Sequence, residues 1–249
     1  FGARFIQPLP SLSSFSQSLS AGLDYKDFAE NVRITSDTGL ETPISYLHTA
    51  LQYNGNLRTD HTNTGFNLVV GLGLRPLGNS TIEFENKRFL ADGDYFYLRG
   101  GVQHERQSLW GLRLFGRLAG QFSVDPLISN EQFAIGGLDT VRGYLDSEQL
   151  GDTGFSGSLE VRSPPLTRWL GASASGSHFF GFFDAGVVST LQPLPRQASR
   201  TDLSSWGLGF RAFAFYGIDA DLTWAYPLVY GNRVEPGESR VHVLMRYSF

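Results

Sequence analysis

The chain has 249 residues, of which 41% are hydrophobic, 18% charged and 14% aromatic, with no cysteine and a formal net charge of −4. The lack of cysteine excludes disulfides, thiolate metal sites and cysteine nucleophiles, and it suits an oxidising compartment. The slightly acidic balance excludes the strongly basic surface by which proteins bind nucleic acid, so we predict no nucleic-acid partner.

Two kinds of membrane segment can be assessed directly. No apolar run approaches the roughly 18 residues that a transmembrane helix needs, and residues 1–10 lack the charged-then-apolar pattern of a signal peptide. A transmembrane β-barrel stays open, because its strands alternate apolar and polar residues and average to a moderate hydropathy. The period with which apolar and polar residues alternate therefore decides whether a transmembrane β-barrel is possible.

Apolar and polar residues alternate from early in the chain, which is typical of half-buried strands. The alternation is faint over 15–25, 44–53 and 66–74. It is clear in the next two segments, whose apolar faces carry Phe96, Leu98 and Val102 and then Trp110, Leu112, Leu114 and Leu118. Arg113 and Arg117 lie on the opposite face of the second segment.

Residues 124–153 form the longest segment without alternation, and a stretch of that length in a compact domain usually carries function. Gly136 and Gly137 allow a sharp reversal of the chain. The run that follows contains Val141, Arg142, Gly143 and Tyr144. We predict a long functional loop here.

Alternation returns after the loop and continues to the end of the chain. Ser158, Glu160 and Arg162 share one face of a strand whose other face carries Leu159 and Val161. In the following strand, Asp184 lies opposite Phe179, Phe183 and Val187. Three further apolar faces carry Trp206, Leu208, Phe210 and Ala212, then Ala220, Leu222, Trp224 and Tyr226, then Val241, Val243, Met245, Tyr247 and Phe249.

This pattern fits either a soluble β-sandwich or a membrane barrel. Strands of soluble proteins average about 5–6 residues, whereas several here reach the roughly 9–11 residues of a tilted membrane strand. Arginines in mid-strand and aromatic residues near strand ends fit a polar lumen and aromatic girdles. We therefore predict an all-β fold, an antiparallel transmembrane β-barrel of about ten or eleven strands over residues 1–249, with a lumenal loop at 124–153.

The run from Gly136 to Tyr144, with sequence GGLDTVRGY, resembles the VRGY signature of the lumenal loop in the superfamily of outer-membrane protein transporters that includes BamA and the two-partner secretion pores. Residues 158–164 and 182–186 resemble two strands that follow this loop in the superfamily. The combination is most similar to the two-partner secretion, or haemolysin activator, branch. The match is specific over about residues 130–190 and loose elsewhere.

The resemblance implies that Arg142 is locked to Asp184 and Glu160. The alternation supports this arrangement, because it points both carboxylates inward from neighbouring strands, where a guanidinium can make bidentate contacts. The other members of the predicted loop lock are Gly136, Gly137, Val141, Gly143 and Tyr144. The alternatives are that Arg142 is a solvated loop arginine and that the carboxylates are ordinary solvated lumenal groups.

The end of the chain carries a second resemblance. Phe249, after the alternating Tyr247, Met245 and Val243, resembles the signal by which bacterial outer-membrane barrels are recognised by their assembly machinery. The pattern also fits an edge strand that closes a sheet, and both interpretations can hold together. We predict that this machinery and the outer-membrane lipid are partners of the chain.

The resemblance implies an integral protein of the bacterial outer membrane that secretes an unfolded partner polypeptide, with inward arginines as a polar wall, no cofactor and no enzymatic activity. The alternatives are a BamA-like assembly factor and a plain porin. The family barrel has roughly sixteen strands after periplasmic POTRA modules. Neither those modules nor its first strands can be recognised here, so we expect the C-terminal part of a longer transporter or a short relative that closes differently.

Other chemistries find little support in the sequence. The segment 154–157 is only a near match to a nucleophile elbow and lies where the loop enters a strand. The histidines are scattered and form no HExxH motif. We predict no catalytic residue and no metal site.

Overall fold

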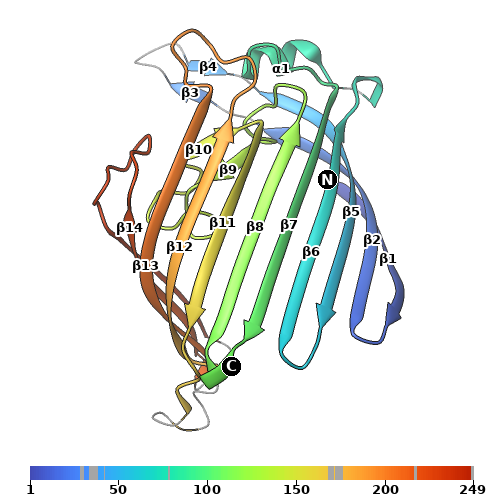
Figure 1. Ribbon diagram of the computed structural model, residues 1–249. Helices are drawn as coiled ribbons and strands as arrows, with labels where there is room; N and C mark the ends of the chain where they lie inside the picture. Colours follow the sequence, from blue (N-terminus) through green and yellow to red (C-terminus); the bar gives the residue numbers. More distant parts are fainter. Residues whose placement is uncertain are drawn as a thin grey trace.

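The computed structural model describes residues 1–28, 31–33, 39–41, 43–77, 79–167, 171, 176–215 and 218–247. Eleven strands form one antiparallel sheet that curves around an inner space (Figure 1). In sheet order they are β1 (Gly2–Leu12), β2 (Phe15–Phe28), β5 (Ile44–Arg58), β6 (Thr62–Gly73), β7 (Tyr95–Gln107), β8 (Arg113–Ser123), β11 (Thr153–Arg162), β12 (His178–Ser189), β13 (Arg200–Phe215), β14 (Ile218–Pro227) and β15 (Arg240–Tyr247).

Short elements lie between these strands. Two hairpins form from β3 (Asn31–Arg33) with β4 (Gly39–Glu41), and from β9 (Phe133–Ile135) with β10 (Gln149–Gly151). The helical pieces are η1 (Arg75–Leu77), α1 (Thr81–Lys87) and η2 (Leu109–Gly111). No helix within the described ranges is long and apolar enough to cross a membrane.

The predicted alternation of faces is confirmed. Leu159, Leu208 and Val243 point outward and are 67%, 58% and 65% exposed, whereas Asp184 and Ser205 on the inner face are fully buried. Soluble proteins rarely expose so large an apolar surface. The outer face therefore suits lipid, and the all-β membrane fold predicted from the period is the observed one.

Buried apolar side chains gather on the concave side, where the loop meets the sheet. One cluster joins Leu127 and Ile128 of the loop to Tyr46, Tyr95 and Phe84. A second cluster contains Phe133, Ile135, Val141, Tyr144, Val188, Leu203 and Val234. The loop thus supplies much of the core that the inner face of the sheet packs against.

Three local expectations differ from the structure. Trp110, predicted in a strand, lies in the η2 turn with a φ of +69°, because the chain reverses between β7 and β8. Val187 points outward as predicted but is only 9% exposed, between Phe155 and Asp202 on the neighbouring strands. The loop spans 124–152 and is not structureless, because it contains the β9–β10 hairpin and Thr153 already belongs to β11.

Two elements had no signal in the sequence pattern. β1 contains Pro8 and Pro10, which cannot donate a backbone hydrogen bond, and it lies at the edge of the sheet, where proline is tolerated. α1 has seven residues, too few for a helical period, and it forms because the Ser80 side chain caps its start and Phe84 packs in the first core cluster.

Leu51 and Gln52 are neighbours in β5 and point to opposite faces, which gives a matched test of the lipid-facing side. We expect Leu51→Arg to lower the free energy of unfolding by about 2–4 kcal/mol, because a charge near the centre of a bilayer is poorly solvated. Gln52→Arg should lower the free energy of unfolding clearly less, since this side chain faces the lumen. Urea unfolding in lipid vesicles measures both, and equal losses would contradict the assignment of faces.

Candidate functional site

Glycines set the path of the loop between β8 and β11. Gly136, Gly137 and Gly143 have φ values of +102°, +95° and +92°. Such backbone angles strain any other residue, and a Cβ at Gly136 would lie 2.6 Å from the Cβ of Glu148. The chain can therefore turn sharply after β9, and Arg142 lies on the segment that joins β9 to β10.

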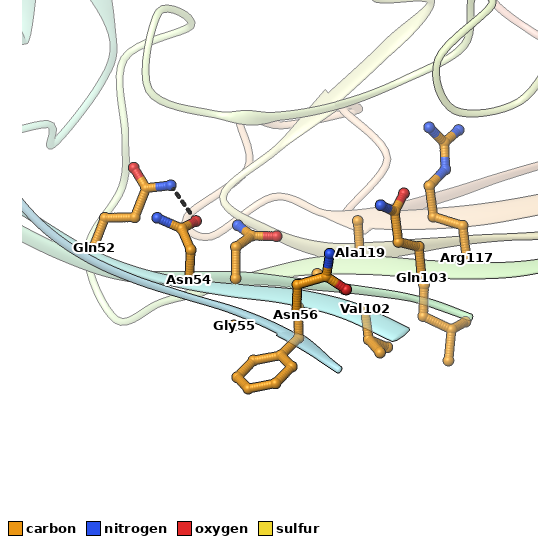
Figure 2. A pocket seen from close by; sticks show the side chains of 13 residues that line it. Gln52, Asn54, Gly55, Asn56, Val102, Gln103, Arg117 and Ala119 are labelled. Carbon is orange, nitrogen blue, oxygen red and sulfur yellow. Dashed lines mark hydrogen bonds between the residues drawn. The ribbon is translucent and has the colours of Figure 1, made fainter. Parts of the chain in front are cut away.

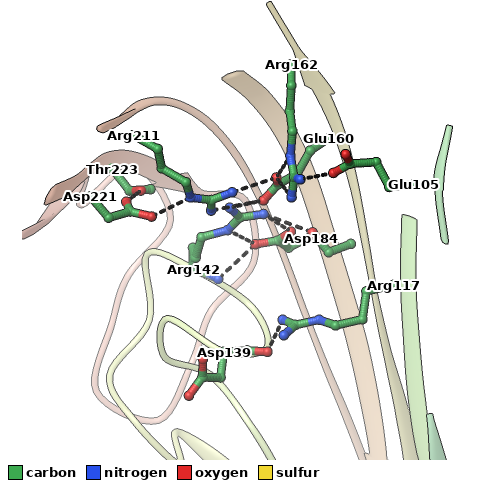
Figure 3. Close-up of polar contacts among 11 residues, drawn as sticks. Glu105, Arg117, Asp139, Arg142, Glu160, Arg162, Asp184, Arg211, Asp221 and Thr223 are labelled. Atoms are coloured by element: carbon green, nitrogen blue, oxygen red, sulfur yellow. Dashed lines mark hydrogen bonds and ion pairs between the residues drawn. The ribbon is translucent and has the colours of Figure 1, made fainter. Parts of the chain in front are cut away.

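The guanidinium of Arg142 is held by two carboxylates and a hydroxyl (Figure 3). Its Nε and Nη2 each donate to Asp184 at 2.7 Å, which makes a bidentate pair. Nη1 donates to Glu160 at 2.7 Å and Nη2 also donates to Ser158 at 2.9 Å. The Phe182 ring centroid lies 3.6 Å from the guanidinium carbon, so the cation is also stacked on an aromatic face.

This pair of charges is removed from water. Arg142 is 4% exposed and Asp184 is fully buried. Burial opposes the charged form of the guanidinium, but the two carboxylates outweigh it and raise the pKa of Arg142 above its ordinary value. The arginine therefore stays charged, and the buried carboxylates depend on it for compensation.

The two carboxylates depend on Arg142 to different degrees. Among the described residues, Asp184 receives hydrogen bonds from Arg142 alone, including one from the backbone N–H at 3.1 Å. Glu160 also pairs with Arg162 at 2.8 Å and with Arg211 at 3.1 Å. Loss of Arg142 would thus leave the buried charge of Asp184 without a partner, whereas Glu160 would keep two other arginines.

The ion pairs continue on both sides of Glu160 across the inner wall. Arg162 also contacts Glu105, which lies 3.5 Å from Arg113, and Arg211 lies 2.6 Å from Asp221 on the next strand. The four arginines Arg113, Arg142, Arg162 and Arg211 are matched by the four carboxylates Glu105, Glu160, Asp184 and Asp221. Arg113, Arg162 and Arg211 on the inner face are therefore engaged in pairs and do not form an open polar wall.

Val141 and Tyr144 fasten the chain on either side of Arg142. Both are fully buried in the second core cluster. The Tyr144 hydroxyl lies 2.9 Å and 2.7 Å from the carbonyl oxygens of Ser204 and Val229, and it accepts a hydrogen bond from the Val229 N–H. These contacts attach the loop to β13 and to the segment after β14.

Two further contacts tie the loop tip to more distant strands. Arg117 of β8 donates to the backbone oxygen of Asp139. The N–H of Gly143 donates to Nε2 of His242 on β15 at 3.3 Å. The segment around Arg142 is thus held by strands on both sides of the loop.

The root of the loop has its own buried charge, Glu131. Its carboxylate accepts from Lys26 and from the Tyr46 hydroxyl at 2.5 Å each, and from the Tyr97 hydroxyl at 3.2 Å. These partners lie on β2, β5 and β7, away from the strands that hold Arg142. The loop is therefore attached to both halves of the sheet.

Asp152, at the end of the loop, completes this attachment. The fully buried carboxylate accepts from Arg88 at 2.8 Å, from the Leu127 N–H at 2.8 Å and from the Leu191 N–H at 2.6 Å. It thereby connects the start of the loop, the segment after α1 and the turn after β12. Alternation of apolar residues carries no information about such contacts, because they join irregular segments.

Sequence reasoning missed several members of this site. Glu131 lies 105 and 85 residues from its partners Lys26 and Tyr46, and no motif links them. Phe182 was noticed only as part of a family block, although it shares the inward face of Asp184. Alternation with Phe210 and Ala212 points Arg211 inward, but its pairing with Glu160 depends on the curvature of the sheet.

Of the two residues of the predicted assembly signal, the structure describes Tyr247. Tyr247 lies in β15 and is 67% exposed. Phe249 lies outside the described residues.

Among the residues described, no group of three or more His, Cys, Asp or Glu side chains could hold a metal ion. The near match to a nucleophile elbow lies within β11, in regular strand geometry.

A curved antiparallel meander with an apolar outer face, whose inner face binds a long loop through a buried arginine, is the architecture expected for the wall of a transmembrane β-barrel. The family model for the haemolysin secretion/activation protein ShlB/FhaC/HecB matches residues 17–212. The chain belongs to this family of two-partner secretion transporters, which are integral to the outer membrane of Gram-negative bacteria. A search of curated protein sequences finds no match.

Solved structures of related proteins share the fold. CdiB from Escherichia coli has a TM-score of 0.78 at 17% identity, over 98% of this chain and 45% of that chain. CdiB from Acinetobacter baumannii has a TM-score of 0.71 at 16% identity, over 98% and 41%. BamA from Haemophilus ducreyi lacking POTRA domains 1–3 has a TM-score of 0.66 at 13% identity, over 98% and 53%. The chain thus spans about half or less of the length of these structures.

The unequal dependence of the carboxylates on Arg142 can be measured by double-mutant cycles. We expect the coupling energy between Arg142→Ala and Asp184→Ala to approach the upper end of about 0.5–3 kcal/mol, and that between Arg142→Ala and Glu160→Ala to lie near the lower end. Glu160 keeps two other arginines, whereas Asp184 has none. Unfolding in detergent gives the free energies, and similar couplings would contradict the contacts described above.

The contacts of the buried Glu131 carboxylate predict a stability effect at the root of the loop. Glu131→Gln removes the partner of Lys26 and weakens the hydrogen bonds from two tyrosines, so we expect a loss of about 1–3 kcal/mol in the free energy of unfolding. Glu85→Gln, on the exposed side of α1, is the matched control and should change it by less than about 0.5 kcal/mol. If Glu131→Gln lowers the free energy of unfolding no more than Glu85→Gln does, Glu131 does not hold the root of the loop.

Proposed function

We propose that the chain is the pore-forming part of an outer-membrane transporter that secretes an unfolded partner polypeptide, without a cofactor or a catalytic step. Family membership supports this assignment. The observation that carries it is the buried clamp of Arg142 on Asp184 and Glu160, which holds a long loop inside the curve of the sheet.

The clamp acts as a loop lock made of Arg142, Asp184, Glu160 and the flanking Gly136, Gly137, Val141, Gly143 and Tyr144. Several strong hydrogen bonds converge on one guanidinium, so the tip has one stable position. In that position the loop leaves part of the inner wall open, which is the conductive arrangement. Displacing the arginine would allow the loop to fall into the path of the polypeptide.

Further strands complete the barrel in this proposal. Within the described part of the chain, β1 and β15 each pair with one strand and not with each other. An open sheet edge in lipid leaves backbone groups without hydrogen bonds, which is costly. Strands from the same or another chain would cover both edges, and the barrel assembly machinery would insert the whole, with Tyr247 and Phe249 as its signal.

Replacement of Arg142 tests the lock. In the intact transporter, in its outer membrane, we expect Arg142→Ala to reduce release of the partner into the medium at least tenfold, because Asp184 would be left buried and uncompensated. Arg196→Ala, at an exposed turn, is the control and should secrete normally. Heat-modifiable migration on gels would show whether both barrels are folded.

Each alternative predicts a different outcome. A plain porin would show steady ion conductance that is indifferent to Arg142→Ala. An assembly factor would, on depletion, halt the appearance of other outer-membrane barrels. Undiminished secretion by a folded Arg142→Ala barrel would remove the lock from the mechanism.

A further inference from the structure

The inner face of β5 and β6, together with Gln103 on β7, carries neutral amides, whereas the ion pairs begin at Glu105 on β7 and continue over the strands from β8 to β14. The amide wall consists of Gln52, Asn54 and Asn56 on β5, Asn67 on β6 and Gln103 on β7. The register places Asn54 beside Asn67, and Gly65 between Asn56 and Gln103. Figure 2 shows the side chains of Gln52, Asn54 and Gln103 on the same face of the sheet as Arg117.

The floor of this wall is hollowed by small residues. Gly65, Gly101 and Ala119 occupy inward positions between the amides. The amides lean over the two glycines, since a Cβ at Gly101 would lie 2.8 Å from Oδ1 of Asn67 and one at Gly65 would lie 3.1 Å from Nε2 of Gln103. The result is a shallow groove that exposes hydrogen-bonding groups along its length.

Most of these groups are free to bind a ligand. Gln52 donates to Asn54 at 2.8 Å. The side chains of Asn56, Asn67 and Gln103 make no hydrogen bond with any residue that the structure describes. Their donors and acceptors therefore face the inner space, whereas the arginines of the other wall are already paired.

We propose that the amide wall is a track on which the transported polypeptide slides in an extended conformation, bound through its main chain. This inference rests on the proposed function. A carboxamide both donates and accepts, as does each peptide unit of the ligand. Gln52, Asn54 and Asn56 follow each other at every second residue of a strand, a spacing of roughly 6.6–6.8 Å that matches the repeat of an extended chain.

The lack of charge on the amide side chains suits them to binding a sliding polypeptide. Main-chain hydrogen bonds do not depend on the side chains of the ligand, so one track can serve a long and varied sequence. Each bond replaces one to water and is weak on balance, so the chain can advance by exchanging one amide for the next. A charged wall would instead retain segments of opposite charge and repel those of like charge.

The loop lock borders this track. Arg117 lines the groove and donates to the backbone oxygen of Asp139, three residues before Arg142 (Figures 2 and 3). A shift of the loop tip would therefore break this contact and change the width available beside the amides. The lock keeps the track open, and the track guides the chain past the lock.

A combined replacement tests the track. In the intact transporter, Asn54→Leu, Asn56→Leu, Asn67→Leu and Gln103→Leu together keep branched side chains of similar length but remove the hydrogen bonds, and we expect secretion of the partner to slow about fivefold or more. Replacement of the same four residues by Ser restores donors and acceptors and should return the rate to within about twofold of the wild type. Asn86→Leu, on the exposed side of α1, is the control.

A single photo-crosslinking substitution gives a second measurement that tolerates a poorly folding combined variant. Asn56→p-benzoylphenylalanine should form an adduct with the partner during secretion, whereas the same replacement of Asn86 should not. If the wild type secretes the partner but the Leu variant is equally fast, or Asn56 yields no adduct, the track is disproved while the transport function stands. If the wild type releases no partner, the proposed function itself fails.

Discussion

A guanidinium removed from water and shared by two carboxylates is the interaction on which the arrangement of this protein depends. Asp184 has no other cationic partner among the described residues, so its position in the middle of β12 requires Arg142. The energetic logic is asymmetric, because a buried pair adds modest stability while a buried single charge costs several kcal/mol. The loop therefore has one well-defined place against the sheet.

The loop also resolves a problem of packing. The apolar side chains of the sheet point outward and are suited to lipid, so they cannot form an interior core as they would in a water-soluble domain. The two larger buried apolar clusters instead lie where the loop meets the concave face, around Ile128 at the root and Val141 near the tip. Glu131, Asp152 and Arg142 add polar attachments at three points, which hold the loop to both halves of the sheet.

The inner wall is divided by charge. On the strands around Glu160, arginines and carboxylates alternate and neutralise one another beside the loop. On β5 and β6, with Gln103 of β7, the wall carries uncharged amides that are open to the inner space. One side thus holds the loop, while the other carries the amides that we propose as a track for a passing polypeptide.

The sequence by itself determined most of the strands, their faces and the class of the protein. A period of two is a local property, and it places Glu160 and Asp184 inward whatever their neighbours are. It also exposed the interruption at 124–153 and the motif around Arg142. It could not reveal β1, whose prolines obscure the strand pattern, or α1, which is shorter than two helical turns.

Only the tertiary structure decided which inward groups meet. Arg211 reaches Glu160, and Glu131 reaches Lys26 and Tyr46, because the sheet curves and the loop folds into the curve. These contacts join residues that are 51, 105 and 85 positions apart. Strand periodicity specifies the side to which a residue points, whereas contact across a lumen depends on curvature, register and loop path, which belong to the assembled chain.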